Sequence, residues 1–454
     1  MVPWLAHGHA TPFFELAKKL SKHNLHIYLC STSAVLNFLK QSQENYYLSS
    51  NNTSSIELIE LHLPSMPELP SHHHSTKGLP NHLYPILLKA FQMSGEIFSK
   101  IVDDLNPDLI IENFFQTWAL DVALSRNIPV VNFGVTSASS YSFMYHLYLH
   151  DGAIDDFPFP ELCLHDNEVR TLLSPGDTKS ITTFMEMSFC FNTLKKSSSI
   201  ILLNNWKETE VKYMHYFSSI TNKKILSVGP LIGQIDQNTS SGDYISQDDS
   251  DIIQWLDKKD RFSTVYVVFG SENVWSKEDI QEIAHGIELS NVNFLWVLRY
   301  PGRDGRSCDV EEVLPEGFVK RVKDRGLVVS KWVPHARIMR HPSIGGFLTH
   351  CGWNSTIECM HFGVPLIAMP YNIDQFLTAK YVVELGIALE VGRDENVRLE
   401  REEIAKAIRN VIAEKKGEEL RTKSGELSEK IRIKEKEDIE EEAVEELRKL
   451  CLMN

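Results

Sequence analysis

The sequence predicts an α/β protein with two domains, each built on a parallel β-sheet. The chain opens with a short apolar strand, MVPWLA, then a helix over residues 7–24 with apolar side chains at helical spacing, then a second strand, LHIYLCST. The second half repeats this alternation from STVYVVFGS onward. Such an order favours parallel sheets with right-handed crossovers, whose ligands lie beyond the carboxyl ends of the strands.

A polar, acidic stretch without apolar periodicity separates the two halves. We take it as a linker over residues 233–250, which gives an N-terminal domain over residues 1–232 and a C-terminal domain over residues 251–430. Residues 431–454 form a last helix whose apolar stripe predicts packing on one of the domains. Two facing domains with a cleft between them are the simplest architecture for this pattern.

Composition excludes several classes of partner. The 454 residues are 43 % hydrophobic and 24 % charged, as in an ordinary soluble globular protein, and the net charge of −15 disfavours nucleic acid and anionic membranes as partners. The sequence has no long apolar run and no signal-peptide pattern. Its seven cysteines are scattered, without CxxC spacing, which indicates reduced thiols. We expect a cytoplasmic monomer.

Residues 332–375 contain the pattern of an anion site. An apolar strand ends at His350, a tight loop with Gly352 follows, and a helix begins near Asn354 and Ser355. Free backbone N–H groups and the positive end of the helix dipole would point at a ligand there. His350 would add a side-chain donor.

The same stretch resembles the signature box of the plant family 1 UDP-glycosyltransferases, through W-x-P…H-P-x-x-G-x-F-x-x-H-C-G-W-N-S…E…G-V-P…P…D-Q. The resemblance extends over nearly the whole chain. It implies the GT-B fold, with two Rossmann-like domains facing an interdomain cleft. The N-terminal domain would bind the acceptor, residues 251–430 would bind the UDP-sugar, and the last helix would return to the N-terminal domain.

The resemblance also implies how the nucleoside is bound. Trp332 would stack on the uracil, as aromatic side chains stack on bases. Glu358 would accept hydrogen bonds from both ribose hydroxyls, and it lies four residues after Asn354 on the same helix face. The family more commonly has Gln where this chain has His335, a position against the uracil edge, and we expect His335 to preserve uracil recognition because it can still donate.

Phosphate and sugar contacts follow from the same box. The phosphate-binding residues implied are Ser271, His350, Asn354 and Ser355. The residues implied to face the sugar are Trp353, Asp374 and Gln375. A Gln at the end of the box resembles glucose-using members, so UDP-glucose is the expected donor substrate. Helix-end donors could neutralise the leaving diphosphate without a metal, and we expect no cofactor and no metal ion.

A histidine near the N-terminus is the expected general base, since an acceptor hydroxyl must lose its proton as it attacks. Gly8-His9 resembles the family's catalytic position, which assigns the base to His9 and leaves His7 as the alternative. The family places an Asp where this chain has Asn113. Asn113 could hold the imidazole through its carbonyl oxygen, Glu112 could reach it through a bulge, or the chain could be a weakened enzyme; we favour the first.

Resemblance further indicates the branch that adds a sugar to glucosides of terpenoids, flavonoids or lignans. The alternative acceptor is an aglycone hydroxyl. A nicotinamide oxidoreductase is disfavoured because the chain lacks G-x-G-x-x-G after a strand. A non-catalytic UDP-sugar-binding protein stays open because of Asn113.

Overall fold

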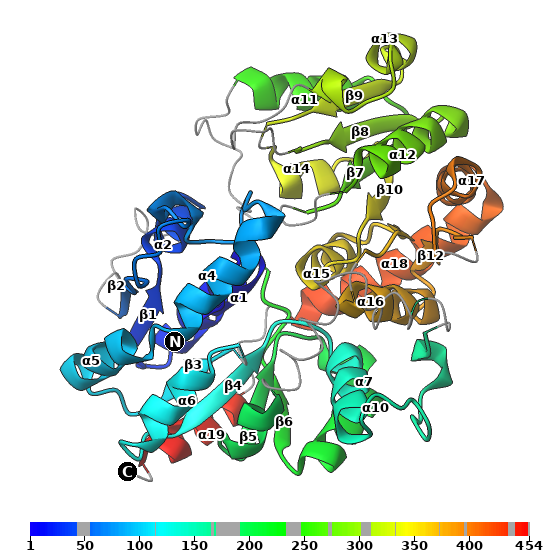
Figure 1. Ribbon diagram of the computed structural model, residues 1–454. Coiled ribbons are helices and arrows are strands. Elements are labelled where there is room, and N and C mark those ends of the chain that lie inside the picture. The colour runs from blue at the N-terminus through cyan, green and yellow to red at the C-terminus, as the bar shows by residue number, and fades with distance from the viewer. Residues whose placement is uncertain are drawn as a thin grey trace. The chain divides into compact units, whose positions relative to one another are not determined.

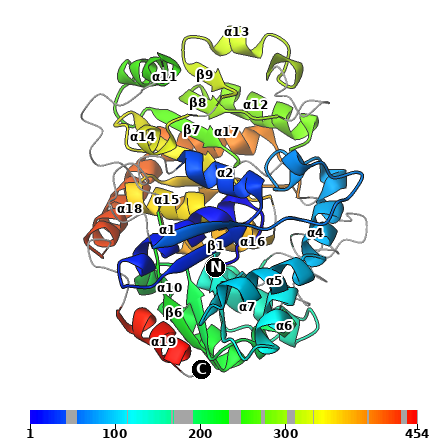
Figure 2. The same cartoon turned by 90° about the vertical axis from the view of Figure 1, so that its left-hand side faces the viewer.

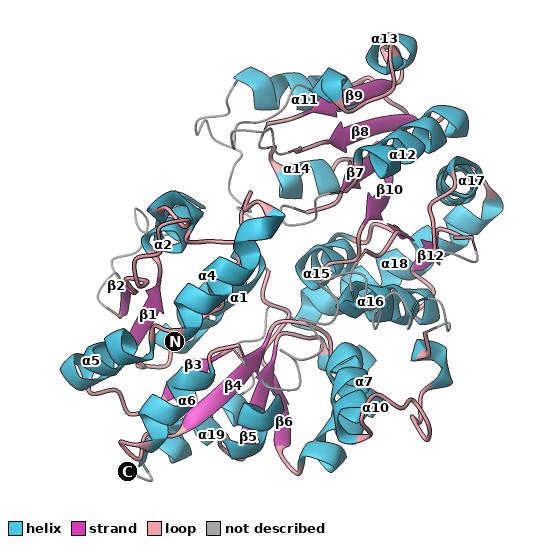
Figure 3. Ribbon diagram, viewed as in Figure 1, coloured by secondary structure: helices cyan, strands magenta, loops and turns pink. Residues whose placement is uncertain are grey.

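The computed structural model divides the chain into two compact units, each an α/β structure (Figures 1 and 3). Unit 1 comprises Met1–Phe157, Pro175–Gly233 and Glu435–Asn454, and unit 2 comprises Pro158–Ser174 and Gln234–Lys434. The structure describes residues 1–42, 55–113, 115–164, 168, 191–232, 247–270, 275–300, 310–331, 333–371, 373–394, 397–434 and 441–452. The predicted α/β class with parallel sheets is confirmed in both units.

Unit 1 contains a four-stranded and a two-stranded sheet, both parallel. The larger sheet has the order β3 (Ile110–Glu112), β4 (Val130–Gly134), β5 (Ile200–Leu203) and β6 (Lys224–Ser227), and the smaller pairs β1 (Ile27–Ser31) with β2 (Ile56–Glu60). The first residues join the two sheets, because Cys30 N donates to Met1 O and Val2 N donates to Ile111 O, each at 2.9 Å. The expected N-terminal strand is therefore reduced to a single bridge at Val2.

The helices of unit 1 are α1 (His7–Ser21), α2 (Ser33–Ser42), α4 (Tyr84–Gln92), α5 (Gly95–Leu105), α6 (Thr117–Leu124), α7 (Ala138–Leu149), α10 (Lys207–Thr221) and α19 (Glu441–Leu452), with short 3-10 turns η1 (Ser71–His73) and η2 (Asn81–Leu83). Most helices of unit 1 pack on its two sheets around one apolar core, whereas α7 and α10 pack on each other.

The stretch LYPILLKAFQMSGEIFSKIVDDL, residues 83–105, has apolar spacing that predicts a single helix, and this prediction is wrong because the structure has two helices there, α4 and α5. The apolar periodicity continues through the break between Gln92 and Gly95, so the pattern does not reveal the break. Helix α5 begins at Gly95, where an added Cβ would lie 3.2 Å from Cβ of Trp118. Trp118 also packs edge-on against Phe91 of α4 and Phe98 of α5, so both helices contact this side chain.

The last helix, α19, packs into unit 1. Ala443, Val444 and Leu447 are buried in its apolar core. Lys224, at the start of β6, lies 2.7 Å from Glu442 and 3.1 Å from Glu446. Figure 2 shows α19 beside β6.

Unit 2 is organised by a six-stranded parallel sheet in the order β12-β11-β10-β7-β8-β9. The first strand of this sheet in sequence, β7, is central; β8 and β9 follow on one side of it, and β10, β11 and β12 follow on the other side. A binding crevice is expected where the direction of winding reverses. The strands are β7 (Thr264–Val268), β8 (Asn293–Val297), β9 (Gly326–Val329), β10 (Ile344–Thr349), β11 (Leu366–Ala368) and β12 (Ala388–Glu390).

Helices cover this sheet, with α12 and α17 packed on each other and α17 lying against four of the strands. The helices are α11 (Gln247–Asp257), α12 (Lys277–Ser290), α13 (Phe318–Val322), α14 (His335–Met339), α15 (Trp353–Phe362), α16 (Ile373–Glu384), α17 (Arg401–Ile412) and α18 (Lys415–Lys434), with 3-10 turns η3 (Pro160–Leu162) and η4 (Val310–Glu312). Helix α11 begins at Gln247, within the expected linker.

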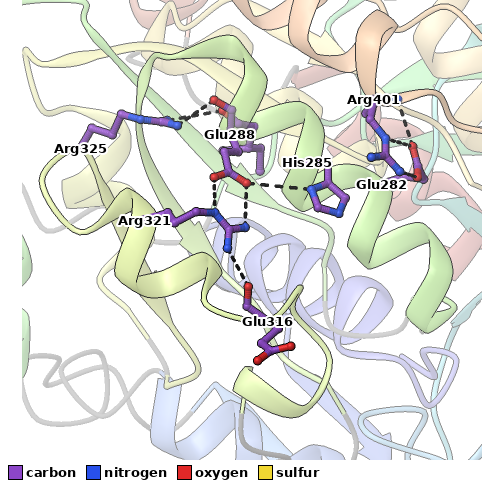
Figure 4. A network of polar contacts seen from close by, with 8 residues as sticks. Glu282, His285, Glu288, Glu316, Arg321, Arg325 and Arg401 are labelled. Atoms are coloured by element: carbon purple, nitrogen blue, oxygen red, sulfur yellow. Dashed lines mark hydrogen bonds and ion pairs between the residues drawn. The ribbon is translucent and has the colours of Figure 1, made fainter.

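Ion pairs attach α12 to its neighbours (Figure 4). Arg321 of α13 makes a bidentate pair with Glu288, at 2.6 and 3.0 Å, and Arg325 donates to the Glu288 backbone oxygen at 2.7 Å. Glu282 pairs with Arg401 at the start of α17. These contacts link α12 to α13, to the loop before β9 and to α17.

A short segment of the N-terminal half belongs to unit 2, which differs from the expected boundary at residue 232. In it, η3 packs against α16, and Glu168 lies 3.1 Å from Nζ of Lys380. Lys380 also pairs with Glu390 at 3.0 Å. A buried two-carboxylate contact of this kind cannot be read from local sequence.

Candidate active site

His9 and Asn113 are hydrogen-bonded in unit 1. His9 lies in the first turn of α1, and its Nδ1 is 2.8 Å from Oδ1 of Asn113, which directly follows β3 and is fully buried. Nδ2 of Asn113 donates to Phe133 O at 3.1 Å. Because that bond identifies the amide nitrogen, Oδ1 must accept from His9, so Nδ1 carries the proton.

The remaining ring nitrogen of His9, Nε2, therefore has a free lone pair in the neutral ring. Within the described part of the chain, Nε2 has no hydrogen-bond partner. Burial lowers the pKa of His9 to about 4, against the opposing effect of the hydrogen bond to Asn113. The imidazole is thus neutral at physiological pH and presents an acceptor atom.

Glu112 does not contact His9. It is 1 % exposed, and its Oε2 has no hydrogen-bond partner among the described residues. Burial and the nearby charge of Asp121 raise the pKa of Glu112 well above its ordinary value. His7 is also separate from Asn113, because its ring stacks on Phe38 with centroids 3.6 Å apart. Of the candidates, Asn113 and His9 are the pair that the fold brings together.

His350 occupies the switch point of the unit 2 sheet. It follows β10, next to the end of β7, and is 8 % exposed. A Cβ on Gly352 would lie 2.5 Å from its Nε2, and one on Gly270 would lie 2.9 Å from its Cε1. The two glycines therefore leave the space that the imidazole fills.

Neutral His350 is suited to donate through Nε2. Burial lowers its pKa to about 4. Thr349 Oγ1 lies 3.4 Å from Nδ1, and if this hydroxyl donates, the ring proton sits on Nε2. Nε2 has no hydrogen-bond partner within the described residues.

The loop after His350 leads into the N-terminus of α15. Cys351 adopts a left-handed backbone with φ of 65°, which is uncommon for a side chain other than glycine, and Gly352 is the N-cap. Asn354 and Ser355 lie in the first turn, as the sequence predicts, where backbone N–H groups lack intrahelical partners. Trp353 is 4 % exposed and packs against Tyr381 of α16.

His335 contacts Glu358 directly. Its Nε2 is 3.0 Å from Oε2 of Glu358, and its Nδ1 is 3.0 Å from the hydroxyl of Tyr266 on β7. The two side chains are 28 % and 30 % exposed, so the carboxylate is open to a ligand. Both ring nitrogens thus have protein partners.

Asp374 and Gln375 lie in the first turn of α16. Burial raises the pKa of Asp374, although its carboxylate accepts backbone N–H groups that oppose the shift. Gln375 is 7 % exposed, and its Oε1 accepts from Tyr371 N at 3.0 Å. Because its oxygen accepts this bond, the side-chain nitrogen is the donor end of the Gln375 amide.

Two family models match the chain. One, described as UDP-glucoronosyl and UDP-glucosyl transferase, matches residues 251–424, and one, described as glycosyltransferase, N-terminal domain, matches residues 1–233. Mogroside IIIx synthase of Siraitia grosvenorii is 44 % identical over 442 residues, covering 97 % of this chain and 95 % of that protein. The chain belongs to the plant family 1 UDP-glycosyltransferases. It is a UDP-dependent glycosyltransferase.

Further relatives of this glycosyltransferase agree. Beta-D-glucosyl crocetin beta-1,6-glucosyltransferase of Gardenia jasminoides is 40 % identical, covering 98 % of this chain and 97 % of that protein. The crystal structure of a Glycyrrhiza uralensis glycosyltransferase complexed with glycyrrhetinic acid 3-O-monoglucuronide matches with a TM-score of 0.81 at 26 % identity, covering 100 % of this chain and 96 % of that chain. The GT-B fold is confirmed.

Some expectations for the glycosyltransferase lie outside the described residues. Ser271 and Trp332 are among them, so their roles stay predictions. In the described ranges, no group of three His, Cys, Asp or Glu side chains is arranged to hold a metal ion. No described helix is both long and apolar enough to cross a membrane.

The sequence does not predict two contacts of the glycosyltransferase, the one between Tyr266 and His335 and the one between Thr349 and His350. Tyr266 was predicted as part of a buried strand, and its hydroxyl gave no separate signal because aromatic residues are ordinary in strands. Thr349 likewise ends an apolar strand. A polar atom on a buried strand next to the switch point is the signal that could have found both.

Proposed function

We propose that this enzyme transfers glucose from UDP-glucose to a hydroxyl of a small-molecule glycoside, with inversion and without a metal ion. His9 is the general base in this proposal. The observation that carries it is the 2.8 Å contact between His9 and Asn113, which leaves the lone pair of Nε2 available.

In the proposed reaction, Nε2 of His9 takes the proton of the acceptor hydroxyl. The oxygen attacks the anomeric carbon of α-linked UDP-glucose as the bond to the β-phosphate oxygen breaks. UDP leaves with the electron pair, and a β-glucoside forms. A single displacement inverts the anomeric centre, and no enzyme carboxylate is needed as a nucleophile.

Donor binding is assigned to unit 2. His350 and the first turn of α15, with Asn354 and Ser355, are proposed to bind the diphosphate and to stabilise the charge that develops on it. Glu358 is proposed to bind the ribose hydroxyls. Neutral buried His350 and the open Glu358 carboxylate support these roles. Asp374 and Gln375 are proposed to bind glucose.

Acceptor class is inferred from relatives. The Gardenia jasminoides enzyme is named for adding glucose to a glucosyl crocetin, and the Glycyrrhiza uralensis structure contains a glycoside. We therefore propose a sugar hydroxyl of a glycoside as the nucleophile. The chemistry at His9 is the same for an aglycone hydroxyl, which is the second candidate acceptor.

The test is UDP release from UDP-glucose with matched pairs of aglycone and monoglucoside. Turnover restricted to monoglucosides, with a β-linked product, is the expected result. Turnover on aglycones alone would replace the acceptor assignment. UDP binding by calorimetry, with no release on any acceptor, would instead favour a UDP-sugar-binding protein with an inactive His9–Asn113 pair.

A further inference from the structure

His335 connects a rigid strand to an open carboxylate. Tyr266 lies on β7, the central strand where the sheet reverses direction, and is fully buried. Its hydroxyl meets Nδ1 of His335, and the opposite ring nitrogen meets Oε2 of Glu358, each at 3.0 Å. Phe347 on β10 packs edge-on against the imidazole, with centroids 5.8 Å apart. The ring is therefore restrained along both its edges.

Hydrogen-bond chemistry sets the direction of this chain of contacts. An ionised carboxylate only accepts, so Nε2–H of His335 donates to Glu358. In the neutral ring Nδ1 then accepts from the Tyr266 hydroxyl, and in the charged ring it donates to it. Burial raises the pKa of Tyr266 far above its usual value, so its proton stays on the oxygen. The contact with Glu358 thus persists in both protonation states of His335.

One oxygen of Glu358 is fixed in this way and the other is not. Oε1 has no partner within the described residues, and Oε2 retains a second lone-pair site. A carboxylate held at one corner cannot rotate freely, yet it still offers acceptors on its open edge. That is the arrangement suited to a vicinal diol.

We propose that His335 is a positioning residue of the donor site, which orients Glu358 for the ribose diol by linking it to Tyr266. The inference rests on the proposed donor role of Glu358. It gives His335 a function different from direct recognition of the uracil edge, because both of its ring nitrogens are engaged by protein.

The test is a mutant cycle on the full-length enzyme, read by calorimetric affinity for UDP and for 2′-deoxy-UDP. Glu358→Ala should weaken UDP binding about tenfold or more, and His335→Ala about three- to tenfold. If His335 acts through Glu358, His335→Ala should cause no further loss in the Glu358→Ala background. The preference for UDP over 2′-deoxy-UDP should shrink in each variant, and His335→Gln, which can still donate to Glu358, should restore part of it.

His341 provides a matched control. Its ring makes the same pair of contacts, with Ser343 Oγ at 2.8 Å and Asp257 at 3.0 Å, on residues that have no part in the proposed site. His341→Ala should leave the UDP to 2′-deoxy-UDP ratio unchanged. Tyr266→Phe keeps the ring packing and removes only the hydroxyl, so it should weaken UDP binding about twofold to threefold. It is the variant to use if His335→Ala fails to fold.

The outcomes distinguish the positioning role of His335 from the ribose-binding role of Glu358. If Glu358→Ala weakens UDP binding but His335→Ala and Tyr266→Phe leave the ratio unchanged, the inference is overturned and the donor role of Glu358 stands. If losses from His335→Ala and Glu358→Ala are additive, His335 acts independently and the inference is likewise wrong. If Glu358→Ala has no effect on UDP affinity, Glu358 does not bind the ribose and His335 cannot act through it. Measurable UDP binding by the wild type would still support a donor site in this enzyme.

Discussion

The side-chain oxygen of Asn113 lies 2.8 Å from Nδ1 of His9, at the position where a carboxylate would stabilise an imidazolium. An amide fixes the ring and its tautomer equally well, but it supplies no negative charge. Burial therefore dominates the electrostatics of His9 and lowers its pKa to about 4. Asn113 therefore orients His9 well, but the low pKa makes His9 a weak base.

Asn113→Asp should raise turnover, because the new carboxylate favours the protonated ring that forms in the transition state. It should also raise the pKa of His9. Since the base acts in its neutral form, the acidic limb of kcat/KM should move from near pH 4 in the wild type to higher pH in the variant. Steady-state rates across pH measure both effects. A tenfold or greater fall in turnover at neutral pH would refute this role for Asn113.

Gly352→Ala should weaken UDP binding about tenfold by displacing His350. The added Cβ would lie 2.5 Å from Nε2, whereas the backbone φ of −60° suits alanine. Gly425→Ala is the control, because Gly425 lies in α18 with nothing within 4 Å of its Cβ position. That change should leave UDP affinity unaltered and stabilise the helix by up to about 1 kcal/mol. Equal UDP affinity in both variants would argue against the proposed phosphate contact of His350.

Stability should fall in acid partly through His350. Its pKa is about 4 in the folded protein, and an unfolded histidine titrates near pH 6.5. Between these values the unfolded chain binds a proton that the folded state does not, so the free energy of unfolding decreases as pH drops from about 7 to about 5. This group alone contributes about 2 kcal/mol to the decrease. Urea unfolding of His350→Gln should show a decrease smaller by that amount; identical pH dependence in the two proteins would contradict the pKa.

The sequence predicts most of the elements and few of the contacts between them. Strand β7, strand β10 and helix α15 could be located because apolar runs end at small or polar residues. The bond between His335 and Tyr266 could not, since it joins the start of α14 to β7 across 69 positions of sequence. Periodicity also gives no sign of the break before Gly95, and local sequence does not show that Trp118 of another helix approaches this residue.

The pairing of His9 with Asn113 was foreseen through family resemblance and chain alternation. Their spacing alone does not predict it, because 104 residues separate them. The sequence leaves open whether Glu112 or Asn113 reaches His9, and the 2.8 Å contact of His9 with Asn113, in line with the alternation of side chains along β3, decides it in favour of Asn113.

The most direct test of the proposed mechanism compares His9→Ala with His7→Ala in UDP release and UDP binding. His7 neighbours His9 in α1 and has a pKa also lowered to about 4 by burial, but its ring stacks on Phe38. We predict that His9→Ala nearly abolishes glucosyl transfer with unchanged UDP affinity, while His7→Ala retains both. Transfer by His9→Ala at the wild-type rate would contradict the assignment of His9 as the base.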